Sequence, residues 1–200
     1  IEMNKAGEVT FKNVVTFNMD EYVGLPREHD QSYWYFMHDN FFNHIDIPAE
    51  NVNILNGMAD DLEAECARYE AKIASYGGID LFMGGSGVDG HIAFNDPPVA
   101  DFNDPKIIKK VTLDDVCRMQ QVHDGCFPTF DDVPKYALTL TVPTLMSAEY
   151  LVCTVPASTK ANAVKAMLEG EYGEICPATA LRKHKGARMF LDKDSAQKVL

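Results

Sequence analysis

The sequence predicts an α/β protein with a parallel, doubly wound sheet. Stretches of strand length alternate with stretches of helix length along all 200 residues. The apolar run at 79–83 has the pattern of a buried strand, and it leads directly into a loop with four glycines. Such a loop at the carboxyl end of a strand is where α/β sheets bind ligands. The length predicts a single domain over residues 1–200.

Individual elements are predicted from periodicity and from flanking residues. β-branched or alternating apolar runs predict strands at 12–17, 79–83, 107–113, 136–142, 150–155 and 187–191, with a short strand in the connector 48–55. Helical spacing and capping residues predict helices at 29–42 (N-cap Asp30 or Ser32), 59–76, 114–121 and 161–169, a turn of helix after Pro143, and helices starting at Cys176 and Asp194. Residues 1–6 resemble a helix end stopped by Gly7, so we expect the start of the domain to precede Ile1.

Composition excludes several classes of function. The net charge of −12 argues against a general binder of nucleic acid or anionic membranes, because both surfaces are negative. The sequence has neither a run of eighteen apolar residues nor a signal-peptide pattern. Its five cysteines are scattered and form no CxxC pair, which disfavours zinc and disulfide frameworks. We therefore expect reduced thiols in a cytoplasmic protein.

The glycine loop contains Gly84, Gly85, Gly87 and Gly90, and residues 85–90 match G-x-G-x-x-G. A dinucleotide site needs this motif to open a helix. Here Pro97 follows within seven residues of the motif, next to a second proline, and forbids an immediate helix. We therefore expect neither a nicotinamide nor a flavin cofactor.

Acid–base groups gather around the same loop. Asp89 and His91 lie within it, Asp96 follows, and Asp20 comes just after the predicted strand 12–17, at the same sheet edge if the strands are parallel. Taken alone, Asp20 is also a candidate helix cap. A histidine beside carboxylates can transfer protons near neutral pH, and a separate carboxylate can take a proton from carbon. The set fits aldose–ketose proton transfer on a sugar phosphate.

Lys160 is the candidate anion ligand. It falls in the first turn of the predicted helix 161–169, after Ser158 or Thr159 as cap, where a cation opposes the helix dipole. A phosphate at that helix end would account for it, and a lysine that extends into solvent is the alternative. Ser86 lacks the G-x-S-x-G context of a nucleophile, and the sequence shows no convincing metal cluster.

Two long segments carry a family resemblance. Residues 14–26 and 84–95 resemble the signature segments of the glucosamine-6-phosphate deaminase (isomerase) family, and residues 133–139 and the helix at Lys160 are similar too. The resemblance covers nearly the whole chain. It implies a three-layer Rossmann-like, mainly parallel sheet with helices on both faces and no cofactor. It implies that glucosamine 6-phosphate and water give fructose 6-phosphate and ammonia. It also suggests a homo-oligomer, with a monomer as the alternative.

The resemblance also implies residue roles. Asp20 would move a proton from C2 to C1 of the open-chain sugar, and His91 would open the ring, oriented by Asp89. Asp96 would be the third carboxylate of this relay. The substrate-binding residues implied are Lys160, for the phosphate, together with Gly85, Gly87 and Tyr22.

Four departures from the family pattern stand out. Asp96 replaces the usual glutamate, and residues 98–105 differ where allosteric contacts often lie. The expected phosphate arginine has no match; Asp124 lies near its position, and Arg118 is the candidate substitute. The family's phosphate loop would lie before Ile1. The alternatives are a related sugar-phosphate isomerase, a phosphogluconolactonase and a non-catalytic sugar-phosphate sensor. Asp20 favours the deaminase, because a lactonase needs no carbon base.

Overall fold

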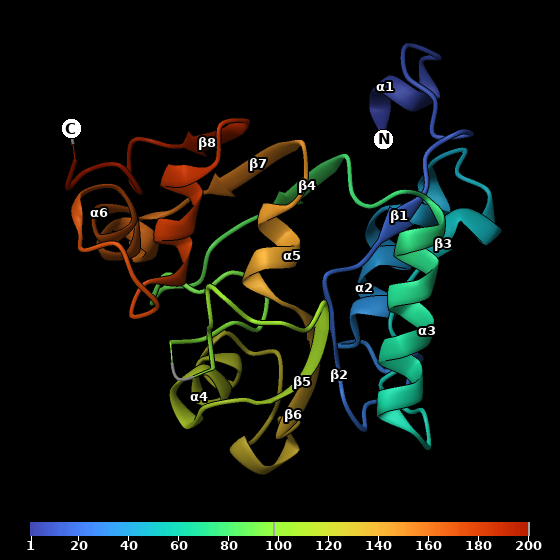
Figure 1. Ribbon diagram of the computed structural model, residues 1–200, viewed down its shortest axis with the longest axis horizontal. Helices are drawn as coiled ribbons and strands as arrows, with labels where there is room; N and C mark the ends of the chain where they lie inside the picture. The colour runs from blue at the N-terminus through green and yellow to red at the C-terminus, as the bar shows by residue number, and fades with distance from the viewer. Residues whose placement is uncertain (98, 200) are drawn as a thin grey trace.

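The computed structural model describes residues 1–97 and 99–199 and has a mixed α/β fold, which confirms the predicted class (Figure 1). Parallel pairing joins β1 (Thr16–Phe17) to β3 (Val52–Asn53). A second parallel sheet has the order β4-β7-β8, formed by β4 (Leu81–Gly84), β7 (Tyr150–Val155) and β8 (Ala187–Leu191). The predicted strands at 79–83, 150–155 and 187–191 therefore pair side by side.

A third sheet is antiparallel and has the order β2-β6-β5. It contains β2 (Asp20–Tyr22), β6 (Tyr136–Leu140) and β5 (Ile108–Thr112). The sequence predicts a loop at Asp20, and this is wrong, because Asp20, Glu21 and Tyr22 pair with Thr139, Leu138 and Ala137 of β6. The strand predicted at 12–17 is correspondingly short and covers only β1.

The helices surround these sheets (Figure 1). They are α1 (Glu2–Lys5), α2 (Tyr33–Asn40), α3 (Leu62–Ser75), α4 (Asp115–His123), α5 (Val142–Met146) and α6 (Ala161–Glu169). Short 3₁₀ helices cover Phe42–His44, Ala49–Asn51, Phe130–Asp132, Ser158–Lys160 and Pro177–Lys183. Ser32, Asp61 and Asp114 cap α2, α3 and α4, each accepting a backbone N–H three residues on.

Two helix predictions need correction. Neither Ser158 nor Thr159 caps α6, because both belong to the 3₁₀ helix that ends at Lys160. The predicted helix from Asp194 is a set of turns. There the carboxylate of Asp192 accepts the N–H of Ser195 at 2.7 Å, and this local bond competes with helix formation.

The core has two parts. The larger surrounds the parallel sheet β4-β7-β8 and includes Tyr69 of α3, Leu151 of β7 and Val164 of α6. Successive side chains of β4 alternate, so that Phe82 is buried while Leu81 and Met83 are exposed. The smaller part is largely aromatic and includes Tyr22, Phe94 and Phe127. None of the described helices is both long and apolar enough to cross a membrane.

The aromatic helix α2 lies at the edge of this smaller core. Tyr33 packs against it, but no residue of α2 is fully buried, and Phe36 is 53% exposed. The prediction of a helix here is confirmed, with Ser32 as its N-cap.

Candidate active site

The loop after β4 fixes the ring of His91 against Gly87. The Gly87 N–H donates to the carbonyl of His91 at 3.0 Å, and Gly90 has a φ of +86°. A Cβ added to Gly87 would lie 2.1 Å from Cε1 of His91, so only glycine fits there. Residues 85–97 contain no helix, which confirms that the glycine motif does not open one.

Two carboxylates flank one nitrogen of the His91 ring. Nδ1 lies 2.7 Å from Oδ1 of Asp89 and 3.0 Å from Oδ1 of Asp96. Burial alone would lower the pKa of His91, but the hydrogen bonds and charges of both aspartates raise it to about 9. The pKa of Asp89 is lowered, because the hydrogen bond and charge of His91 outweigh its burial. The predicted trio Asp89, His91 and Asp96 is therefore brought together, with the imidazole held in its charged form at neutral pH.

Asp96 is the most deeply buried member of this trio, at 1% exposure. Apart from the contact with Nδ1 of His91, its carboxylate oxygens have no hydrogen-bond partner among the described residues, so the imidazolium is what offsets the cost of burying this group. The three ligand atoms lie within 4.8 Å of one another, which is close enough for a metal ion. A proton on Nδ1 already accounts for the arrangement, and a metal at that nitrogen would have to displace it.

Asp20 is a second, separate carboxylate. It is 9% exposed, and no hydrogen bond to its carboxylate occurs within residues 1–97 and 99–199. Burial, followed by the charge of Glu21, raises its pKa to about 7, while the charge of His91 opposes the rise. A carboxylate with this pKa is a much stronger base than an exposed aspartate and is still half ionised near neutral pH.

Strand β6 holds the two parts of the site together. Thr139 stands opposite Asp20 in the strand register, and its Oγ1 accepts the N–H of Phe94 at 3.2 Å. The fully buried side chain of Asn95 donates to the carbonyls of Ile92 and Leu140, both at 2.9 Å. The loop that carries His91 and the strand that carries Asp20 are thus fixed to the same element.

Lys160 is half-buried; it is the last residue of the 3₁₀ helix and the N-cap position of α6. Burial lowers its pKa, and the charges of Asp124 and Asp89 oppose this shift, so Lys160 lies within electrostatic reach of the His91 relay. The turn before it is strained: Ala157 has a φ of +80°, and its N–H donates to Asp192 at 3.0 Å. The hydrogen bond to Asp192 helps to hold this turn, which ends three residues before Lys160.

The remaining predicted residues are placed differently. Tyr22 is 2% exposed and stacks on Tyr33 at 5.4 Å, so its ring belongs to the aromatic core. Gly85 is exposed, and a Cβ there would lie 3.0 Å from the carbonyl of Thr154. Arg118 is 4% exposed and donates to the carbonyls of Phe130 and Val133, both at 2.9 Å. These bonds commit its guanidinium to the fold and argue against a role on phosphate.

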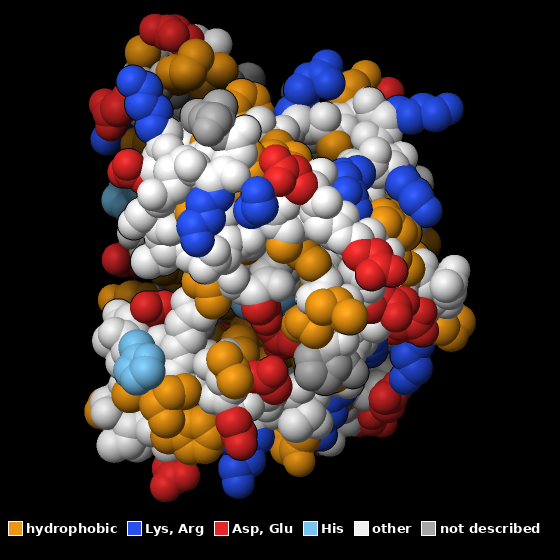
Figure 2. Space-filling view, turned by 90° about the vertical axis from the view of Figure 1, so that its left-hand side faces the viewer, with side chains coloured by type: hydrophobic (Ala, Val, Ile, Leu, Met, Phe, Trp, Pro, Cys, Tyr) orange, Lys and Arg blue, Asp and Glu red, His pale blue; other side chains and the backbone are white. Residues whose placement is uncertain are grey.

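The face seen in Figure 2 is hollowed near its middle, and acidic side chains gather around the hollow.

Three residues that contribute to the site have no role predicted from the sequence: Glu21, Asn95 and Asp192. Asn95 and Glu21 lie inside the signature segments, so their position was a usable signal. Nothing in the sequence pointed to Asp192, because Ala157, whose N–H it accepts, has the residue type of an ordinary loop position.

An α/β fold that presents an imidazolium between carboxylates and a separate buried carboxylate defines an acid–base site. The chain belongs to the family described as glucosamine-6-phosphate isomerases/6-phosphogluconolactonase, whose model matches residues 1–190. It is 53% identical to a glucosamine-6-phosphate deaminase of Glaesserella parasuis over 199 residues, covering 100% of this chain and 74% of the relative. The corresponding protein of Yersinia pestis is 51% identical, with 100% and 73% covered.

Solved structures agree with this family. A protein described as a monomeric glucosamine-6-phosphate deaminase superposes with a TM-score of 0.92 at 38% identity, covering 98% of this chain and 80% of that one. The 6-phosphogluconolactonase of Thermotoga maritima superposes with a TM-score of 0.70 at 22% identity, covering 94% and 77%, and shows the shared fold.

Proposed function

We propose that this protein converts glucosamine 6-phosphate and water to fructose 6-phosphate and ammonia. The observation that carries the proposal is that β6 fixes a buried carboxylate, Asp20, together with the loop of His91, whose imidazole lies between two carboxylates. Burial raises the pKa of Asp20 to about 7, and the two flanking aspartates raise the pKa of His91 to about 9. Between these two values the first group is a carboxylate base and the second a charged acid. The names of the relatives that are 51–53% identical support the same substrate.

In the proposed reaction, His91 protonates the ring oxygen while the anomeric hydroxyl loses its proton, and the sugar opens to the aldehyde. Asp20 then removes the proton from C2 while the oxygen on C1 takes up a proton, which leaves an enolamine between C1 and C2. Return of a proton to C1 gives the imine of the ketose. Water adds to the C2 imine carbon, and ammonia leaves. The steps up to the ketose imine rearrange the sugar by acid–base chemistry, and the last one forms a C–O bond to water as the C–N bond to ammonia breaks. The reaction is therefore an isomerisation followed by hydrolytic loss of the amine.

Asp89 and Asp96 would hold His91 in its charged form and fix the orientation of its ring. Lys160 would bind the phosphate through its charged amine, at the end of the 3₁₀ helix that precedes α6. Gly85 and Gly87 would allow the sugar to approach the loop backbone. Tyr22, two residues after Asp20 on the same face of β2, would support this face of the strand from the aromatic core.

Hydrolysis of a phosphogluconolactone is the second candidate, since the family description includes that activity. Opening a lactone requires no proton transfer at carbon. In that reaction, the carboxylate of Asp20, whose pKa is raised, would have no proton to remove from carbon. The deaminase proposal is favoured for that reason.

We propose a reducing compartment such as the cytoplasm, because all five cysteines are free thiols. Assembly into a homo-oligomer remains a prediction, and one solved relative is described as monomeric.

The test is release of ammonia from glucosamine 6-phosphate, coupled to appearance of fructose 6-phosphate. The protein assayed should be the full-length product of its gene. Equal amounts of the two products are expected, with no turnover of 6-phosphogluconolactone. Lactone hydrolysis without ammonia release would overturn the proposal in favour of the second candidate.

A further inference from the structure

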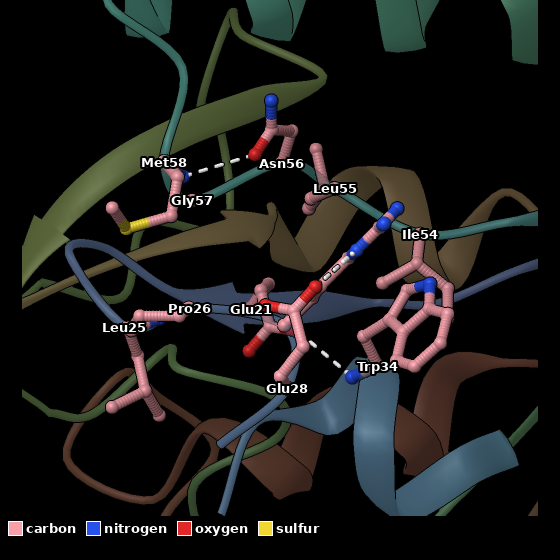
Figure 3. Close-up of a pocket in the computed structure, with 11 residues that line it drawn as sticks. Glu21, Leu25, Pro26, Glu28, Trp34, Ile54, Leu55, Asn56, Gly57 and Met58 are labelled. Atoms are coloured by element: carbon pink, nitrogen blue, oxygen red, sulfur yellow. Dashed lines mark hydrogen bonds and ion pairs between the residues drawn. The ribbon is translucent and has the colours of Figure 1, made fainter.

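Glu21 is a buried charge that the proposed reaction does not use. It directly follows Asp20 in β2, so the two side chains point to opposite faces of the strand. Glu21 is 3% exposed and lines a pocket of about 560 Å³ to which Asp20 does not contribute. Figure 3 shows Glu21 among the residues lining this pocket, with Trp34 beside it.

The carboxylate of Glu21 is fixed by backbone donors alone. Its Oε1 accepts the N–H of Tyr22 at 2.9 Å and of Tyr33 at 3.1 Å, and its Oε2 accepts the N–H of Trp34 at 2.9 Å. Tyr33 and Trp34 are the first two residues of α2, where N–H groups lack partners within the helix and the helix dipole favours a negative charge. Burial raises the pKa of Glu21, and the three N–H bonds oppose this. Three donors and no acceptor match the ionised form.

Few charges act on Asp20. Within the described part of the chain, the titratable groups that interact with it are Glu21, His91, Tyr22, Tyr33 and Tyr69. The pKa of each tyrosine is raised, so all three are neutral in the range where the reaction would be assayed. Glu21 and His91 are left as the charges that set the proton affinity of Asp20, and they act in opposite directions.

We infer that Glu21 is a positioning residue: its charge, anchored on the N-terminus of α2, holds β2 in place behind the site and keeps Asp20 a strong base. This inference rests on the proposed function, in which Asp20 takes the proton from C2. The anchor explains why Asp20 can stay in place without a hydrogen bond of its own in the described structure. It also gives the aromatic helix α2 a part in catalysis that its exposed outer face does not suggest.

The test replaces Glu21 with glutamine, which keeps the shape and one acceptor oxygen but removes the charge. The acid limb of the pH profile of kcat/KM is expected to move down by about one pH unit from its wild-type position near 7. A limb that stays in place, with activity reduced equally at every pH, would show a merely structural role and overturn the inference. Glu28→Gln is the matched control, since Glu28 lines the same pocket but is exposed and paired only with Arg27.

A second variant keeps the test valid if the glutamine variant does not fold. Glu21→Asp retains the charge but withdraws it from α2 by one methylene, so the acid limb should stay near 7 while kcat falls. An unchanged kcat would overturn the anchoring role. Urea unfolding of wild type and Glu21→Gln at several pH values follows the titration of Asp20 without substrate. A wild type that releases no ammonia but shows this titration shift would refute the proposed function and not the influence of Glu21 on Asp20.

Discussion

Replacing Asp20 with asparagine should make the protein more stable and inactive. The folded state raises the pKa of this group from 3.8 to about 7, chiefly through burial. Because the folded protein holds the proton more tightly than the unfolded chain, stability falls as the pH rises through this window. The shift of about 3 pH units corresponds to about 4 kcal/mol above pH 7. Burying the asparagine amide without a partner costs about 1–3 kcal/mol, which leaves a net gain of about 1–3 kcal/mol.

The pH dependence is the sharper readout, because the amide cost does not vary with pH. The difference in free energy of unfolding between Asp20→Asn and wild type should widen by about 2.5 kcal/mol between pH 5 and pH 8. Urea unfolding followed by fluorescence at each pH measures it, and a tenfold or smaller loss of kcat in the same variant would contradict the role as carbon base. Asp80→Asn is the control, since Asp80 is exposed. A difference that stays constant across this pH range would refute the reasoning about burial.

Three further results are expected. Gly87→Ala should lower kcat at least a hundredfold in steady-state assays, because its Cβ would displace the His91 ring; Gly173→Ala, with nothing within 4 Å, should have no effect. The profile of kcat/KM against pH should be bell-shaped, with limbs near 7 and 9. Asp89→Asn should move the basic limb down by about one pH unit. A basic limb that does not move would show that it does not report the titration of His91. Lys160→Met should raise KM for the sugar phosphate at least tenfold with a smaller change in kcat, and an unchanged KM would remove it from the phosphate site.

The sequence was sufficient to predict the loop of the site, but it was insufficient to predict β2 beside it. Gly87, Asp89 and His91 lie within five residues, so local spacing alone places them together. Pro97 after the glycine motif was enough to reject a helix there. Asp20 was predicted in a loop because its strand is only three residues long and its pairing partner, Thr139, is remote in sequence. Periodicity cannot reveal a contact of this kind.

The backbone strain at Ala157 and the burial of Tyr22 could not be predicted from the sequence either. Ala157 adopts a φ of +80° that usually calls for glycine, so the residue type gave no warning of the turn that positions Lys160. Tyr22 was assigned to the substrate because it follows Asp20 in a signature segment, yet its ring packs against Phe94 and Phe127. Family patterns report that a residue matters, whereas only the fold shows whether it faces the ligand or the core.

The central place of β6 has a consequence for biosynthesis. Asp20 and the His91 loop both emerge from the ribosome before Tyr136–Leu140, because they precede those residues in the chain. Until those residues emerge, β2 has no partner strand and Thr139 and Leu140 cannot fix Phe94 and Asn95. Asp20 and Asp96 therefore stay hydrated until β6 has been synthesised, and their burial follows the formation of this long-range pairing.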